Sequence, residues 1–310
     1  MSAFNIKDYP HKRLNPLTGD WILVSPHRSK RPWQGQVEKP VQLDRPAYDA
    51  TCYLCPGNER AGGKVNPDYK GTFVFTNDFS ALLNDTPKGR INENEFFKAE
   101  SESGICKVLC FNENHSLTIP EMSIDEIREV VDLWCSEFEE LSKPDSINYV
   151  QIFENKGAIM GCSNPHPHGQ IWSSSSVPVE PVKECKTQKE YFQKHGTTLL
   201  GDYLNFELEK KERILAQNHY FVALVPFWAT WPFETMVISR RPVQNIMELN
   251  DKEKTGLADI YKKLTIKYDN LFEVSFAYSA GFHQAPTDGI DYPEWHLHMH
   301  FYPPLLRSST

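Results

Sequence analysis

The stretch His166-Pro-His168-Gly-Gln170-Ile-Trp172 alternates polar side chains with small or apolar ones. In an extended segment, alternate side chains point to the same face, so the side chains at 166, 168 and 170 can line one cleft. The loop before it, residues 157–164, contains glycines that allow backbone amides to approach an anion. A structural role or a metal site are the alternatives, and the glycine-containing loop favours phosphate chemistry.

A second group of histidines lies near the end of the chain. His296, His298 and His300 alternate in the same way, with His283 upstream, and these are four of the 11 histidines in the sequence. The pattern favours a metal site, with a second catalytic triplet as the alternative. A carboxylate such as Glu184 could complete a coordination shell that accepts iron or zinc.

Each histidine group closes a similar series of predicted elements, so the chain looks duplicated. Ser123 and Glu126 form a capping-box pattern that starts a helix with apolar residues at helical spacing. Strands, a further helix capped at Asn250 and a charged, helical stretch are expected from periodicity and turn signals. The expected strands are 21–24, 72–76, 105–111, 148–153, 220–225, 234–239 and 274–280, and the other helical ranges are 186–215 and 250–271.

Composition sets limits on the function. The 310 residues suggest two domains or one large duplicated domain, and 33 basic against 41 acidic residues give a net charge of -8. This charge would repel nucleic acid and anionic membranes. No apolar run approaches a membrane span of roughly 18 residues, and residues 1–9 lack the apolar core of a signal peptide. Seven cysteines, an odd number, suit a reducing compartment, so a cytoplasmic protein is expected.

Two short motifs remain. Cys52-Tyr-Leu-Cys55 precedes a turn-forming Pro-Gly-Asn, which favours a metal knuckle over a redox pair or two thiols without a function. His115 and His166 could supply two further ligands. The basic cluster His27-Arg-Ser-Lys-Arg31 could be a solvated surface run. Arginine forks also bind phosphate oxygens, so the cluster could serve a site in this chain or in a partner.

These residues resemble the galactose-1-phosphate uridylyltransferase family, a branch of the histidine-triad superfamily. The resemblance covers essentially the entire chain, and the stretch Ser163-Asn-Pro-His-Pro-His-Gly-Gln170 is highly specific to that family. The other stretches that carry it are 15–21, 27–35, 76–79, 153–157, 161–172, 231–235 and 300–308.

The resemblance implies a reaction and its residues. His168 would attack the alpha-phosphorus of a UDP-hexose and hold the uridylyl group, and a hexose 1-phosphate would then take it. Gln170 and Ser163 would hydrogen-bond the non-bridging phosphate oxygens. The exchange would convert UDP-glucose and galactose 1-phosphate into UDP-galactose and glucose 1-phosphate. The further residues implied to bind substrate are Arg28, Arg31, Asn77, Asp78 and Asn155.

The resemblance also implies metals and a partner. One set of ligands would hold zinc and the second would hold another metal, often iron, both with structural roles because all protein positions are filled. Arg28 and Arg31 would approach the phosphates from a neighbouring subunit, so a homodimer with shared active sites is implied. The implied ligands are Cys52, Cys55, His115 and His166 for zinc, and Glu184, His283, His298 and His300 for the second metal.

The implied fold is α+β, with two histidine-triad-like repeats around a mainly antiparallel sheet with flanking helices. The N-terminal repeat would cover residues 1–185 and the C-terminal repeat residues 186–310. Family members continue into a segment that binds hexose 1-phosphate, whereas this sequence stops at Thr310. The expectation is therefore retained His168 chemistry with weak sugar discrimination. A histidine-triad phosphorylase or hydrolase, or a truncated non-catalytic form, is the alternative.

Overall fold

A nine-stranded sheet runs through the protein, and every neighbouring pair in it is antiparallel. The computed structural model describes residues 4–30 and 45–304. The strand order is β3-β6-β8-β7-β12-β13-β11-β10-β9. Its strands are β3 (Phe73–Thr76), β6 (Gly104–Cys110), β7 (Tyr149–Lys156), β8 (His168–Ser174), β9 (Ile214–Gln217), β10 (Phe221–Leu224), β11 (Thr235–Ser239), β12 (Tyr278–His283) and β13 (His298–Tyr302).

The sheet consists of two similar halves that meet at the β7–β12 pair. In the first half β6, a helix, β7 and β8 follow one another, and in the second half β11, a helix, β12 and β13 do. By their order along the chain, β6, β7 and β8 correspond to β11, β12 and β13. The first three lie in the sheet as β6-β8-β7, and their counterparts lie in the reverse order, β12-β13-β11. The expected α+β class with a large antiparallel sheet and flanking helices is confirmed.

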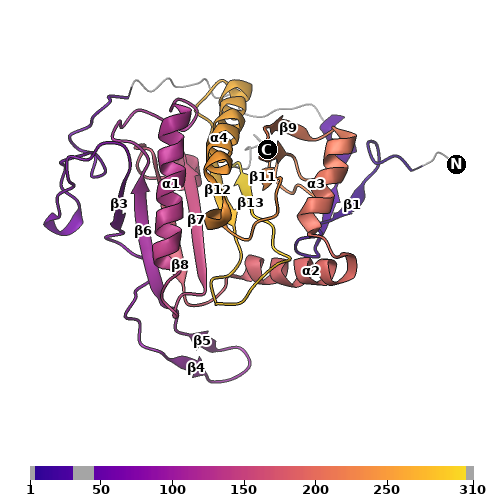
Figure 1. Ribbon diagram of the computed structural model, residues 1–310, viewed down its shortest axis with the longest axis horizontal. Helices are drawn as coiled ribbons and strands as arrows, with labels where there is room; N and C mark the ends of the chain where they lie inside the picture. Colours follow the sequence, from indigo (N-terminus) through magenta and orange to yellow (C-terminus); the bar gives the residue numbers. More distant parts are fainter. Residues whose placement is uncertain (1–3, 31–44, 305–310) are drawn as a thin grey trace.

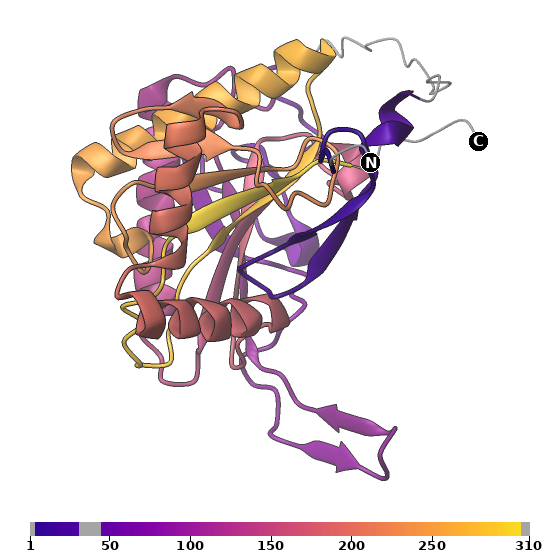
Figure 2. The ribbon, with the colours of Figure 1, turned by 90° about the vertical axis from the view of Figure 1, so that its right-hand side faces the viewer.

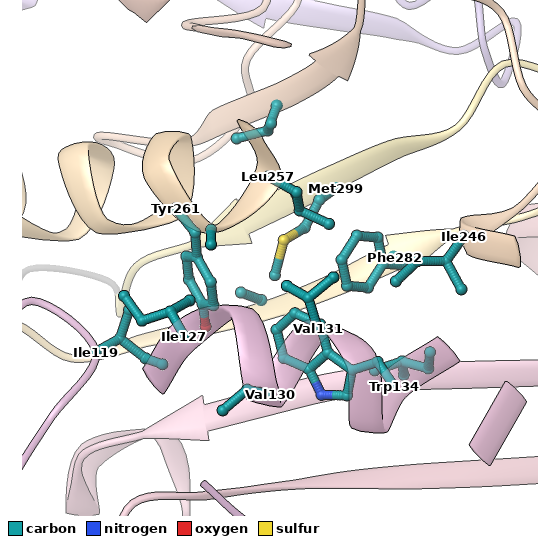
Figure 3. Close-up of a cluster of buried hydrophobic side chains, with 14 of the residues drawn as sticks. Ile119, Ile127, Val130, Val131, Trp134, Ile246, Leu257, Tyr261, Phe282 and Met299 are labelled. Atoms are coloured by element: carbon teal, nitrogen blue, oxygen red, sulfur yellow. The ribbon is translucent and has the colours of Figure 1, made fainter. Parts of the chain in front are cut away.

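The two long helices, α1 (Ile124–Leu141) and α4 (Asp251–Phe272), cover one face of the sheet side by side (Figure 1). Both begin with the capping boxes that the sequence predicts, at Ser123 and Asn250. The main core fills the layer between them and the sheet. Trp134 of α1 has its ring centroid 5.3 Å from that of Phe282 in β12 and 6.0 Å from that of Tyr261 in α4 (Figure 3).

The remaining elements lie outside this layer. The hairpin of β1 (His11–Leu14) and β2 (Trp21–Val24) lies on the side of the sheet away from α1 and α4 (Figure 2). A second hairpin, β4 (Arg90–Asn92) with β5 (Lys98–Glu100), projects from the body in both ribbon views. Helices α2 (Val179–His195) and α3 (Leu199–Lys210) connect the halves of the sheet.

Three expectations about elements need correction. The helical stretch 186–215 is two helices broken at Gly196, and Ile214 and Leu215 belong to strand β9. The last expected strand, 274–280, begins later, at Tyr278. The opening of the chain contains β1 as well as the expected strand 21–24. Within the described part of the chain, no helix has the length and apolar character needed to cross a membrane.

Candidate functional site

His168 opens strand β8 on the face of the sheet opposite to α1 and α4. Along β8, Ile171 is fully buried in the main core, and alternation directs the half-buried His168 and Gln170 to the other face. The Nδ1–H of His168 donates to the carbonyl of His166 at 2.7 Å. This bond fixes the tautomer, so the lone pair of the imidazole is on Nε2. Burial lowers the pKa of His168, which favours the neutral, nucleophilic form.

A cavity of about 390 Å³ lies over this part of the sheet. Aromatic and apolar side chains line it together with polar groups, a combination that suits a nucleoside. Six residues that the sequence singled out are among its lining: Asn77, Asp78, Asn155, Ser163, His168 and Gln170.

Two amide side chains are oriented as hydrogen-bond donors toward this cavity. The Oδ1 of Asn155 accepts from the Ser279 hydroxyl at 2.6 Å, and the Oε1 of Gln170 accepts from Nε1 of Trp172 at 3.1 Å. With their carbonyl oxygens engaged, both side chains have their NH₂ groups left to donate. Donors held in this way are suited to the oxygens of a phosphate.

The loop before β8 is shaped by glycines. Gly157 has φ 91° and Gly161 has φ 80°, and residues with a Cβ rarely adopt this part of backbone space. A Cβ on Gly157 would also lie 2.7 Å from that of Ala277. The loop can therefore pass close to β12 and bring Ser163 to the cavity.

Within the basic cluster, residues 27 and 28 do not line this cavity. Arg28 is exposed in a short helical turn, Pro26–Lys30, and does not line the cavity. Arg31 lies outside the described residues. The described lining of this cavity contains one Arg or Lys side chain, Arg60, which the sequence patterns did not indicate. Arg60 forms an ion pair with Asp78 at 3.2 Å and stacks on the Phe75 ring. Arg60 lies in a loop, where the sequence has no periodic pattern that would predict these contacts.

The first metal cluster comes together from three separate segments. The ligand atoms of Cys52, Cys55, His115 and His166 all lie within 4.8 Å of one another, and all four residues are buried. The Nε2–H of His166 donates to the carbonyl of Asn112 at 2.9 Å, which leaves Nδ1 unprotonated and 3.6 Å from the Cys55 sulfur. Two thiolates and two imidazoles are a donor set that fits tetrahedral zinc.

The second cluster joins α2 to strands β12 and β13. Glu184, His283, His298 and His300 place their ligand atoms within 4.8 Å of one another. The Nδ1–H of His298 donates to the carbonyl of His296 at 2.8 Å, so its Nε2 is free to bind a cation. This atom, one oxygen of Glu184 and Nδ1 of His300 are buried without a hydrogen-bond partner. Unpaired buried acceptors facing each other fit a bound metal ion.

Comparisons with known proteins cover the whole chain. Residues 2–178 match the family model described as galactose-1-phosphate uridyl transferase, N-terminal domain, and residues 184–310 match the model of its C-terminal domain. Galactose-1-phosphate uridylyltransferase from Haemophilus influenzae is 52% identical over 309 residues, covering 100% of this chain and 88% of the relative. The same enzyme from Rattus norvegicus is 49% identical, covering 100% of this chain and 82% of the relative.

Solved structures share the fold at lower identity. An ADP-glucose phosphorylase from Arabidopsis thaliana, with bound ADP-glucose, is 23% identical with a TM-score of 0.75, covering 97% of this chain and 91% of that chain. A uridylyltransferase is 25% identical with a TM-score of 0.73, covering 96% of this chain and 89% of that chain.

Proposed function

Because this chain belongs to the galactose-1-phosphate uridylyltransferase family, we propose that His168 is the group that carries the uridylyl moiety during the reaction. The activity is that of a UDP-glucose–hexose-1-phosphate uridylyltransferase of galactose metabolism, in the Leloir pathway. Its substrates are UDP-hexoses and hexose 1-phosphates.

The orientation of His168 is the observation that carries this proposal. In the first step Nε2 attacks the alpha-phosphorus, a P–N bond forms, and the P–O bond to the hexose 1-phosphate breaks with its electron pair on the leaving oxygen. In the second step a phosphate oxygen of the incoming hexose 1-phosphate attacks the same phosphorus and the P–N bond breaks. The bond from Nδ1–H to the His166 carbonyl holds the ring in place through both steps.

Five further side chains would bind the nucleotide. Ser163 and the NH₂ groups of Gln170 and Asn155 would donate to the non-bridging oxygens, where charge develops in the transition state. Asn77 and Asp78, which line the same cavity, would contact the nucleoside.

We assign structural metals to the two clusters. Zinc suits Cys52, Cys55, His115 and His166, and iron suits the mixed carboxylate and imidazole set of Glu184, His283, His298 and His300. An ion bound at either cluster would cross-link the segments that carry its ligands. It would have no open coordination position for substrate.

The remaining parts of the proposal concern organisation. A homodimer would let Arg28 and Arg31 of one subunit serve the phosphates in the other, and Arg28 does not line the cavity of its own chain. The repeats would divide the chain into 1–185 and 186–310. A cytoplasmic location would suit the seven cysteines, all of which are free thiols.

Product analysis tests the proposed reaction. With UDP-glucose alone, we expect a single release of glucose 1-phosphate, about one per subunit, and with galactose 1-phosphate added we expect continuous formation of UDP-galactose. Continuous formation of UMP without acceptor would instead indicate a hydrolase. UDP formed in the presence of inorganic phosphate would indicate a phosphorylase.

A further inference from the structure

A second cavity, of about 370 Å³, adjoins His168 on another side. It shares Asn155, Cys162, Ser163 and His168 with the first cavity, so the nucleophile lies at the boundary between the two. In the proposed reaction the nucleoside would occupy the first cavity, on one side of the reacting phosphorus, and the group that leaves and later attacks would need space on another side. The second cavity, which also contains Arg45 in its lining, can supply that space.

Three cationic side chains line the two cavities within the described chain, and two of them are neutralised. Arg60 pairs with Asp78 at 3.2 Å, and Lys156 pairs with Asp269 at 3.3 Å. Arg45 has no carboxylate within ion-pair distance among the described residues. In the described part of the chain, its Nη1 donates to the carbonyl of Pro165 at 3.5 Å.

Arg45 is thus a half-buried residue beside the loop of the proposed nucleophile, and most donors of its guanidinium are uncommitted among the described residues. Burial raises the pKa of the Cys162 thiol in this loop, and the positive charge of Arg45 lowers it in part, so the charge of Arg45 reaches the loop. The one carboxyl group in the lining of the second cavity, Glu154, accepts hydrogen bonds from Tyr261 and Tyr278, and burial raises its pKa. These two hydrogen bonds and the nearby Lys156 ammonium offset part of the charge that an ionised Glu154 would present to an anion.

We propose that Arg45 binds the phosphate of hexose 1-phosphate within the same chain as His168. This is the beta-phosphate of the UDP-hexose before the first step and the attacking phosphate in the second step. A guanidinium fork matches a phosphate with two parallel N–H donors, so it would hold the anion in position as well as attract it. The inference rests on the proposed function and adds a cation from the same chain to those proposed from a second subunit.

The test compares Arg45→Gln and Arg45→Lys with Arg90→Gln, which removes an exposed arginine from the projecting hairpin. In Arg45→Gln we expect the KM for galactose 1-phosphate, and the Ki of inorganic phosphate as its competitor, to rise about tenfold. Arg45→Lys should recover part of this loss because it restores the charge without the fork. The Kd of UMP should stay within about twofold, since its nucleoside lies in the first cavity.

Values within about twofold of the parent for both KM and Ki in Arg45→Gln would overturn the inference. An equal loss of UMP binding in Arg45→Gln and Arg45→Lys, with a lower Tm, would also overturn it and indicate a structural role. Labelling of His168 by UDP-glucose in the parent enzyme keeps the two proposals apart. If the parent is labelled and the arginine variants bind phosphate normally, only the role of Arg45 fails.

Discussion

The two histidines that open β8 and β13 have the same local geometry and different surroundings. His168 and His298 each donate from Nδ1 to the carbonyl two residues earlier, at 2.7 and 2.8 Å. Two residues further along, β8 has Gln170 and β13 has His300. The β13 histidine lies among metal-ligand candidates, whereas His168 lines a cavity with amide donors. The neighbouring side chains therefore distinguish the proposed nucleophile, His168, from the candidate metal ligand, His298.

Gly169, between the proposed nucleophile and Gln170, is required by close packing. A Cβ at this position would lie 2.8 Å from Cζ of Phe111 and 2.9 Å from the carbonyl of Phe153. We predict that Gly169→Ala lowers the free energy of unfolding by about 1–3 kcal/mol and slows uridylyl transfer, because β8 must shift to relieve the clash. Denaturant unfolding and initial rates would measure both effects.

Gly89→Ala is the matched control, because a Cβ at Gly89 meets no atom within 4 Å and the residue has no positive φ. It should leave stability and rate nearly unchanged. A Gly169→Ala enzyme as stable and as active as the control would show that the packing at this position does not position the nucleophile.

Alternation along the chain was enough to predict that His168 and Gln170 share a face, because the period of a strand is two. The same reasoning could not find Arg60 over Phe75, or Tyr69 at 3.1 Å from Nε2 of His166. Arg60 and Tyr69 lie in loop segments, where side-chain direction follows from tertiary contacts and not from a repeat.

At the scale of elements, the first metal cluster joins loops that have little regular structure. Cys52 and Cys55 lie in a turn-rich segment, and His115 follows β6 in another loop. We predict that Cys52→Ser lowers bound zinc and reduces Tm by about 5 °C or more, since these loops lose their cross-link. Metal analysis and thermal unfolding of the same sample would measure both.

Cys135→Ser is the control for this prediction. Cys135 is a buried thiol in α1, outside both clusters, that donates to the carbonyl of Ile246. A serine can keep that bond, so the fold should be retained. Because Cys135 is not a candidate ligand, the zinc content should be unchanged. Full zinc content in Cys52→Ser would remove Cys52 from the ligand set.

Most elements were predictable from local signals, including strand β3 at one edge of the sheet, whereas strand β9 at the other edge was not. The helix at Ile124–Leu141 has a capping box and an apolar stripe, and both are visible in the sequence. Strand β9, Ile214–Gln217, follows charged helices and lies at the edge of the sheet, where pairing with β10 decides its structure. No glycine or proline separates Ile214 from the charged helix before it, so no turn signal marks the start of a new element.

At the scale of the whole molecule, the proposed dimer makes each active site depend on two chains. We predict that an Arg28→Ala subunit and a His168→Ala subunit, each nearly inactive alone, regain activity when they are mixed and reassociated. With random pairing, half of the dimers are mixed and one of their two sites is intact, which gives about a quarter of the parent activity. Initial rates before and after reassociation would measure this.

Mixing the His168→Ala subunit with a Gln170→Ala subunit is the control, because both substitutions affect the same chain's site and no intact site can form. If the Arg28→Ala mixture recovers no more activity than this control, Arg28 does not act across subunits.

The most direct test of the central claim is to locate the uridylyl group on the protein. The full chain is incubated with UDP-glucose labelled in the uracil ring, and bound label is mapped by peptide analysis in the parent and in His168→Ala. We expect alkali-stable, acid-labile label at His168, about one per subunit, with none in the variant. Label at another residue, or no label on a folded parent enzyme that turns over substrate, would contradict a uridylyl-histidine intermediate at His168.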